Sequence, residues 1–400
     1  MEFDTLLPVV AVSVLTLVAV STMPARWRLP QVVVLLAGGV LIGPECLHWS
    51  SPEAVGLLSD LGMGFLFLLA GYEIDPGIGR QPAGRLGVRA WLTSIVLGAL
   101  LLVALSITRD VPAIVAITIA LSTTALGVLV PVLKEEGLTD RPLGRYVMAG
   151  GAVGELGPIV AMALFLGTRG TLVALVALVL FAAAVVVLGT LPRRFAFGRT
   201  RGLLRPLGDG TGQGPVRVSL LLLVGLLALS SSMGFDAVLG AFLAGMVLRS
   251  WVPAQDDDLS HKLETVGWGV FIPIFFVSSG MALQLDAIAE QPWLPIVFVV
   301  LIGAVRGGPA LFWYRRHLVP RERVQLGLYT ATTLPMLVAL TQLAVDEGSL
   351  PVGTAGCLVF AGALTVLLFP LLARTLGATD RTEAAGTSGA DDPGDLRDAQ

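Results

Sequence analysis

Glu155 is the only formal charge between Tyr146 and Leu166, and it lies near the middle of that stretch. The stretch is apolar and long enough to cross a membrane. Placing a carboxylate at the centre of a bilayer costs from about 3 to more than 10 kcal/mol, and residues that bear this cost usually handle ions or protons. Glu155 is therefore the first candidate for a cation- and proton-binding group.

Two clusters of hydroxyl side chains are the next candidates. One contains Ser122, Thr123 and Thr124, and the other contains Thr332 and Thr333 with a proline two residues later. A proline inside a span removes a backbone donor and frees carbonyl groups one turn earlier. Hydroxyls beside a broken turn can satisfy those carbonyls or coordinate a cation. Ser and Thr also bridge packed membrane helices, so the structural reading stays open.

Arg306 is a second charge inside an apolar stretch. Burial disfavours the charged form of Glu155, whereas a nearby arginine favours it. Where these effects partly cancel, a proton and a cation compete for the carboxylate. We expect Na⁺ or K⁺ to bind transiently to oxygens of Glu155, Thr123 and Thr124 and to unwound backbone carbonyls. Arg306 could equally bridge helix ends or pair with Glu155 without a transport role.

The composition predicts a membrane protein. Of the 400 residues, 55% are hydrophobic and 14% are charged, where soluble domains have roughly a quarter charged residues. The net charge of −3 is too balanced to indicate a nucleic-acid partner, and we expect no cofactor. Windows of about 20 residues predict about thirteen spans in an all-α polytopic protein embedded in the lipid bilayer. They cover residues 5–22, 31–47, 54–72, 86–108, 112–133, 145–168, 170–191, 216–233, 235–250, 264–281, 292–313, 324–345 and 351–374.

The distribution of basic residues predicts the orientation. Loops after odd-numbered spans, together with the C-terminal end, contain every Lys and Arg except Arg109, Arg169 and Arg306. Cytoplasmic loops of membrane proteins are enriched in these residues. We therefore expect a multi-pass protein of the cell (inner) membrane, with the N-terminus outside and the C-terminus in the cytoplasm.

Similar segments recur in the two halves of the chain. Leu36–Gly43 resembles Leu239–Met246, Phe65–Asp75 resembles Phe275–Asp286, and Leu121–Gly127 corresponds to Tyr329–Pro335. Because an odd seventh span lies between the copies, the second copy is predicted to be inverted, as in many secondary transporters. The interrupted helices of the two copies should then cross near the membrane midplane.

These repeats predict four regions. Residues 1–191 form a first six-helix repeat plus the linking seventh span, and residues 192–215 form a cytoplasmic linker. Residues 216–376 form the second repeat, and residues 377–400 form a disordered cytoplasmic tail, because they are Gly-, Ala- and Asp-rich without apolar periodicity.

A family resemblance rests on several of the same segments: Gly39–Pro44, Leu68–Glu73, Leu121–Ala125, Lys134–Gly137 and Phe275–Met281. With them, the chain from about Leu29 to Leu376 resembles the monovalent cation–proton antiporter superfamily, in its bacterial second branch of sodium/proton and potassium/proton exchangers. The resemblance implies exchange of Na⁺ or K⁺ for H⁺ by an elevator-like motion. It implies a homodimer, with a scaffold of spans one to three and seven to ten and a mobile core of the others.

The sequence departs from this family at one position. Members have Asp-Asp, Asn-Asp or Gln-Asp in span six, and the second residue binds the ion; here the pair is Gly154-Glu155. Members also have a Lys or Arg in span eleven, and Arg306 matches it. Arginine does not deprotonate at physiological pH. With one titrating carboxylate, we expect electroneutral exchange of one proton for one cation.

Three alternatives remain. A membrane-embedded enzyme would need a second catalytic group at the depth of Glu155, and Arg306 is the only other charge there, so we do not expect an enzyme. A sodium-coupled solute symporter on a related fold would need a larger cavity for an organic substrate. A non-transporting or channel-like relative is compatible with the same composition.

Overall fold

The computed structural model describes residues 3–23, 29–74, 81–105, 107–108, 110–166, 171–195, 213–251 and 258–388, and none of them forms a β-strand. The first half contains α1 (Phe3–Thr22), α2 (Gln31–Ile42), α3 (Gly56–Glu73), α4 (Pro82–Ala104), α5 (Val111–Leu121), α6 (Leu126–Glu135), α7 (Pro142–Phe165) and α8 (Thr171–Phe195). The second half contains α10 (Gly214–Ser232), α11 (Ala237–Trp251), α12 (Asp258–Val266), α13 (Ile272–Met281), α14 (Leu285–Glu290), α15 (Trp293–Ile302), α16 (Gly308–Trp313), α17 (Pro320–Thr330), α18 (Pro335–Asp346) and α19 (Val352–Ser388).

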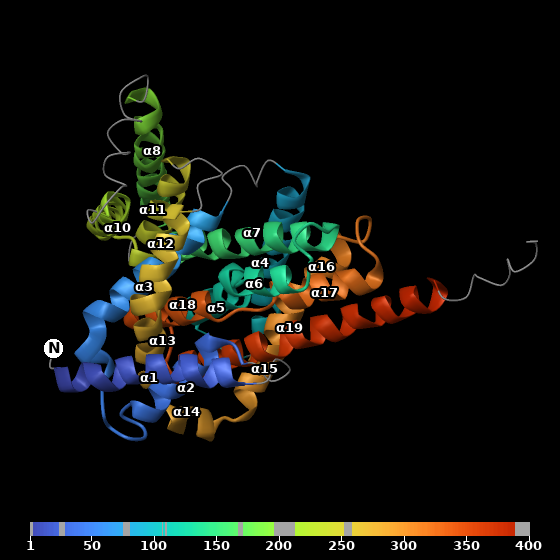
Figure 1. Ribbon diagram of the computed structural model, residues 1–400, viewed down its shortest axis with the longest axis horizontal. Coiled ribbons are helices and arrows are strands. Elements are labelled where there is room, and N and C mark those ends of the chain that lie inside the picture. Colours follow the sequence, from blue (N-terminus) through green and yellow to red (C-terminus); the bar gives the residue numbers. More distant parts are fainter. Residues whose placement is uncertain are drawn as a thin grey trace, which may run out of the picture.

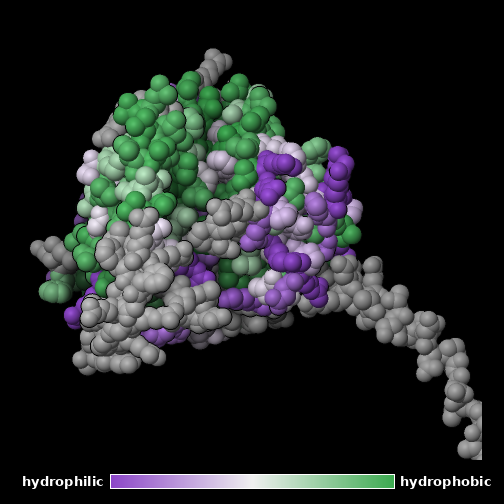
Figure 2. All heavy atoms as spheres, turned by 90° about the horizontal axis from the view of Figure 1, so that it is seen from above, coloured by the Kyte–Doolittle hydropathy of each residue, from purple (hydrophilic) through white to green (hydrophobic). Residues whose placement is uncertain are grey.

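Several of these helices suit a membrane. Within the described part of the chain, ten helices are long and apolar enough to cross one. The bent pair of α17 and α18 meets the same test when taken together, and α2 and α11 are shorter apolar helices. Figure 2 shows hydrophobic side chains over much of the coloured surface, with hydrophilic ones gathered at one end. Such a surface is suited to lipid.

Some spans are assembled from more than one helical segment. A 3-10 turn, η2 (Pro52–Val55), leads into α3. A π-helical segment, η4 (Gly267–Phe271), joins α12 to α13, and a second, η5 (Gly303–Gly307), joins α15 to α16. A π-helical turn is often found at a functional site, and η5 contains Arg306.

Two apolar helices are interrupted where the hydroxyl clusters predict it. The backbone is non-helical from Ser122 to Ala125, between α5 and α6, and from Ala331 to Leu334, between α17 and α18. The second break bends the pair by 45°. Pro335 explains this break, because it has no N–H to continue the helix. The first break has no proline.

Hydroxyl groups account for the first break. The Ser122 hydroxyl donates to the carbonyl of Ile119, and the Thr123 hydroxyl donates to that of Ala120. Ser and Thr side chains that bond nearby carbonyls compete with the helical ladder and favour helix ends. The predicted interruption of both helices is therefore confirmed, with a different cause in each.

Close helix packing surrounds these spans. The helices α3 and α11 touch along much of their length, as do α2 and α13. A Cβ atom on Gly71 of α3 would collide with the backbone carbonyl of Phe242, and one on Gly245 of α11 would collide with that of Leu68. Small residues that let two backbones approach are a common basis of helix association in membranes. In Figure 1, α3 and α11 lie next to each other beside α12.

The C-terminal helix is longer than the sequence predicts. The helix α19, red in Figure 1, extends away from the other helices and continues to Ser388, although we expected a disordered tail from residue 377. Adding residues to an existing helix avoids the cost of nucleation, and no proline follows before residue 388 to stop it. Residues 389–400 and most of the expected linker at 192–215 lie outside the described residues.

The close contact of α3 and α11 yields a first prediction. Replacing Gly245 with alanine should destabilise the protein by about 1–3 kcal/mol, because the added methyl group overpacks the interface. Gly225→Ala in α10 is the matched control, since its Cβ would have no neighbour within 4 Å. Melting temperatures in detergent measure both. Equal melting temperatures for the two variants would contradict the packing assigned to Gly245.

Candidate functional site

The two breaks contact each other, although they are far apart in the sequence. The backbone nitrogen of Ala125 donates to the carbonyl of Thr332 at 2.9 Å. The hydroxyls of Thr123 and Thr333 lie 2.5 Å apart and share a hydrogen bond. The first contact satisfies two backbone groups that the breaks leave without helical partners, and the second joins two side chains. They join α5 and α6 to α17 and α18 as two crossing, interrupted helices.

Glu155 lies on α7 beside this crossing and is 6% exposed. Its Oε1 accepts a hydrogen bond of 2.8 Å from the backbone nitrogen of Leu126, the first residue of α6. The N-terminus of a helix carries unpaired N–H groups and a partial positive charge, and both stabilise an anion. The other oxygen, Oε2, is buried and has no hydrogen bond within the described structure. One oxygen of the carboxylate is therefore fixed, and the other is free to hold a proton or a cation.

A proline positions α7 against the first break. Pro158 lies inside α7 and has no N–H, so the carbonyl four residues earlier, that of Gly154, loses its helical partner. This carbonyl instead accepts a hydrogen bond of 3.0 Å from the backbone nitrogen of Thr124. Pro158 thus frees the carbonyl of Gly154, and this carbonyl holds the first break next to Glu155.

Arg306 is 2% exposed and reaches the crossing from η5. Its Nε donates to the hydroxyl of Thr124 at 2.9 Å, and its Nη2 donates to the carbonyl of Gly150 on α7 at 2.7 Å. The Thr124 hydroxyl donates in turn to the carbonyl of Thr330, the last residue of α17, at 2.6 Å. Among the described residues, no ion pair joins Arg306 to Glu155. Arg306 therefore links η5 to the first break and to α7 through neutral oxygens.

Gly154 has no side chain, and Arg306 occupies the space that a side chain would fill. A Cβ atom at this position would lie 2.6 Å from Nη2 of Arg306 and closer still to the hydroxyl of Thr124. Neither neighbour can move without losing a hydrogen bond. The larger residue that precedes the carboxylate in the related motif does not fit this arrangement, so Gly154 and Arg306 are sterically coupled.

The remaining predicted hydroxyls have local partners. Ser122 bonds the carbonyl of Ile119 in its own chain segment, and Thr332 bonds that of Leu328. Both end a helix and have no contact with Glu155 among the described hydrogen bonds. Thr123 pairs with Thr333 across the crossing. The Thr124 hydroxyl already donates its proton to Thr330 and accepts a hydrogen bond from Arg306. These contacts favour a positioning role for Thr124.

Sequence reasoning missed Thr365 of α19. The backbone nitrogen of Thr333 donates to its hydroxyl at 3.2 Å, and the hydroxyl lies 3.0 Å from the carbonyl of Thr333 and 2.8 Å from that of Gly362. Thr365 is fully buried. From α19 it gives the backbone of the second break a hydrogen-bond partner. The only signal was a threonine in a largely apolar span, and threonine is common where membrane helices pack.

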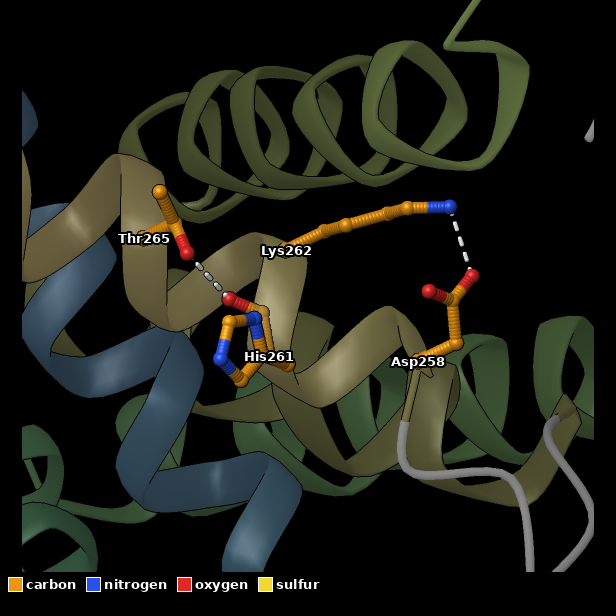
Figure 3. Close-up of polar contacts among 4 residues, drawn as sticks. All are labelled: Asp258, His261, Lys262 and Thr265. Atoms are coloured by element: carbon orange, nitrogen blue, oxygen red, sulfur yellow. Dashed lines mark hydrogen bonds and ion pairs between the residues drawn. The ribbon is translucent and has the colours of Figure 1, made fainter. Parts of the chain in front are cut away.

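The polar cluster at the start of α12 is less informative. Asp256 and Asp257 lie outside the described residues. Lys262 pairs with Asp258 at 2.5 Å, and the Thr265 hydroxyl donates to the backbone carbonyl of His261 (Figure 3). These contacts join residues four apart on the exposed side of α12, and such contacts contribute little to stability. These contacts are those of a solvated surface.

The family of the chain follows from a comparison with known proteins. The family model described as "Sodium/hydrogen exchanger, transmembrane" matches residues 11–376. The chain therefore belongs to this family, within the monovalent cation–proton antiporter superfamily. The family consists of transporters, not enzymes, so the enzyme alternative is excluded.

Individual relatives agree with this assignment. The chain is 28% identical over 387 residues to the glutathione-regulated potassium-efflux system protein KefC of Klebsiella pneumoniae, covering 92% of this chain and 60% of KefC. It is 23% identical over 410 residues to the Na⁺/H⁺-K⁺ antiporter GerN of Bacillus cereus, covering 96% of this chain and all of GerN. The chain spans between 40% and 60% of the length of KefC and two other curated relatives.

The fold is similar to that of a solved structure, the sodium proton antiporter MjNhaP1 from Methanocaldococcus jannaschii. The TM-score is 0.68 at 16% sequence identity, covering 98% of this chain and 100% of that chain. At this identity the likeness concerns the fold alone.

The coupling of Gly154 to Arg306 yields a second prediction. Gly154→Ala should lower the free energy of unfolding by about 1–3 kcal/mol, because the methyl group displaces Arg306 and Thr124. In an Arg306→Met background, the same change should cost less, since the guanidinium is gone. Residues in contact typically show such non-additivity, of about 0.5–3 kcal/mol.

Thermal unfolding of the four proteins in detergent measures this coupling. Gly127→Ala in α6 is the matched control, because a Cβ there has no neighbour within 4 Å. Additive effects of Gly154→Ala and Arg306→Met would show that the two residues do not share this space.

Proposed function

We propose that this protein is a secondary active transporter that exchanges a monovalent cation, Na⁺ or K⁺, for H⁺ across the membrane. One observation carries the proposal. The Oε2 atom of Glu155 is buried without a hydrogen bond, next to the crossing of two broken helices. The names of the relatives, which include a potassium-efflux protein and a sodium and potassium antiporter, support either cation.

The chemistry follows from what a buried carboxylate requires. A charged oxygen without a partner in an apolar interior is strongly unfavourable, so Oε2 must take up either a proton or a cation. The two cannot bind to the same oxygen together, and their competition couples the movement of one to that of the other. The N–H of Leu126 holds Oε1 in place in both states, so the exchange changes only what Oε2 binds.

We propose electroneutral exchange of one proton for one cation. Among the buried residues that the structure describes, Glu155 is the only acidic side chain. Gly154 supplies no second carboxylate, and Arg306 is engaged with neutral oxygens of Thr124 and Gly150. Arginine keeps its charge throughout the cycle. Arg306 then acts as a fixed positive charge that positions the crossing and is not a second proton carrier.

The proposed architecture has thirteen spans in two inverted repeats. It counts the ten long helices, the bent pair of α17 and α18, and the shorter α2 and α11 as crossing the membrane. The interruption of α5–α6 in the first repeat and of α17–α18 in the second is what such a repeat requires. We place the N-terminus outside and the C-terminus in the cytoplasm of the inner membrane. An elevator-like motion and a homodimer remain proposals from the family resemblance.

The carboxylate assignment yields a third prediction. Glu155→Gln should reduce cation-dependent proton movement in proteoliposomes to the level of protein-free vesicles, because an amide cannot exchange a proton for a cation. Glu155→Asp should keep partial activity with an altered apparent cation affinity. Dissipation of a pH gradient on addition of Na⁺, K⁺ or Li⁺ measures the transport.

A control makes this test specific. Glu290→Gln removes a carboxylate from an exposed position at the end of α14 and should leave transport unchanged. Size-exclusion profiles show whether the Glu155 variants fold. Normal exchange by a well-folded Glu155→Gln protein would rule out Glu155 as the carrier.

The stoichiometry yields a fourth prediction. At fixed ion gradients, imposing a membrane potential of either sign should leave the rate and direction of exchange unchanged, because no net charge moves in a 1:1 exchange. Valinomycin is unsuitable for setting the potential if K⁺ is transported, so a lipophilic ion can set it in Na⁺ media. A steady dependence on potential would instead require unequal numbers of protons and cations in each cycle and would contradict 1:1 exchange.

A further inference from the structure

Three arginines from different parts of the chain surround the C-terminal end of α16. The Cζ atom of Arg89, on α4, lies 5.6 Å from the centre of the Trp313 ring, and that of Arg315 lies 4.8 Å from the centre of the Phe312 ring. The Nη1 of Arg323, on α17, donates to a backbone carbonyl of α16 at 2.8 Å. We call these three arginines and two aromatic residues the α16 patch.

The aromatic part of the patch is fixed to its neighbours. The indole nitrogen of Trp313 donates to the hydroxyl of Thr93 on α4 at 2.9 Å, and the rings of Phe312 and Trp313 pack edge to face, 5.6 Å apart. The helix α16 also contacts both α4 and α17 (Figure 1). A guanidinium that lies over such a ring keeps its in-plane N–H groups available to an acceptor. The rings therefore hold Arg89 and Arg315 in place without using their donors.

The positive charge of the patch is not neutralised within the described part of the chain. No ion pair joins Arg89, Arg315 or Arg323 to a carboxylate among the described residues. Arg89 and Arg315 are exposed, and the Nε of Arg323 has no hydrogen-bond partner there. The acidic neighbour of Arg323, Glu322, instead accepts a hydrogen bond of 3.2 Å from the backbone nitrogen of Val319. Guanidinium donors without an acceptor match the oxygens of a phosphate group.

An exposed apolar stripe on α4 begins at Arg89. It consists of Leu92, Val96, Leu100 and Val103, which are 54–62% exposed. Their spacing of three or four residues places them on the same helix face as Arg89. At a rise of about 1.5 Å per residue, the stripe extends about 20 Å from Arg89, which is more than half of the hydrocarbon core of about 30 Å. A whole acyl chain can therefore lie along α4 while its headgroup stays at the patch.

We propose that the α16 patch binds the headgroup of an anionic phospholipid, with one acyl chain along the stripe on α4. The phosphate accepts hydrogen bonds from Arg89 and Arg315, and Arg323 adds positive charge. Basic pockets between membrane helices on the cytoplasmic side recognise anionic headgroups in this way. A zwitterionic phospholipid fits less well, because the same guanidiniums repel its ammonium group. The location in the inner leaflet rests on the orientation proposed above.

Lipid retention tests this site directly. The purified protein is equilibrated in detergent with equal amounts of phosphatidylglycerol and phosphatidylethanolamine that carry identical acyl chains. Native mass spectrometry then measures which lipid stays bound. The wild-type protein should retain phosphatidylglycerol in preference. Arg89→Gln with Arg315→Gln should lower the ratio of bound phosphatidylglycerol to phosphatidylethanolamine about ten-fold, because two charge-assisted contacts to the phosphate are lost.

A matched control separates the site from general positive charge. Arg217→Gln with Arg249→Gln removes two arginines from the ends of α10 and α11 that the proposed orientation places in the cytoplasm. Arg249 also lies over an aromatic ring, that of Tyr72, at 5.5 Å. This variant should keep the wild-type lipid ratio. An unchanged ratio in the α16 variant, or an equal drop in the control, would overturn the proposal. Displacement of the lipid by soluble glycerol phosphate would also overturn it, because the site would then take a soluble phosphate.

A photoactivatable lipid gives a second readout that needs no arginine variant. In vesicles, phosphatidylglycerol with a diazirine in its acyl chain should label α4 near Leu92 and Val96 several-fold more than α15 near Ile296 and Val300. These positions of α15 are also exposed, at 63% and 64%. The matching phosphatidylethanolamine should label the two helices about equally. Labelling of α4 by phosphatidylglycerol at no more than the level of α15 would contradict the site.

The result is independent of the carrier assignment. Glu155→Gln should retain phosphatidylglycerol as the wild-type protein does, because the patch does not depend on turnover. Lipid preference that is preserved in a Glu155→Gln protein that still transports would reject the carrier and leave the lipid site standing. Loss of the preference in Glu155→Gln would show that lipid binding follows the state of the carboxylate and would overturn a preformed site at α16.

Discussion

The hydrogen bond from the backbone nitrogen of Leu126 to Glu155 is the interaction on which the site depends. It exists only because α6 begins there, so that its first N–H groups have no helical acceptor. A continuous helix through residues 121–126 would present no such donor and no positive end to the carboxylate. The interruption of the helix is thus the means by which an apolar interior accommodates an acidic side chain.

The surrounding contacts hold this helix end in position. Pro158 releases the carbonyl of Gly154 to Thr124, and Arg306 joins Thr124 to Gly150 on α7. Gly154 has no side chain, and this leaves room for the guanidinium. Each of these groups is neutral or fixed in charge. The only group in the cluster that can exchange a proton for a cation is therefore the carboxylate itself.

The amino-acid types predicted the chemical groups, but packing decided what they do. A lone buried carboxylate such as Glu155 and a proline such as Pro335 have large local effects. The candidate site and the second break could therefore be predicted from the sequence. Thr124 and Thr365 could not be separated from other hydroxyls, because their partners come from helices distant in the sequence.

The central claim is that one proton and one cation compete for a single carboxylate. The most direct measurement is the number of protons released when purified protein in weakly buffered detergent binds a saturating amount of Na⁺ or K⁺. Proton release is followed by a pH indicator, and bound cation is measured on the same sample. The account predicts that, in acidic medium where Glu155 is protonated, one proton is released at that residue for each cation bound there. Cation binding without proton release under those conditions, or a second proton released per cation, would contradict it.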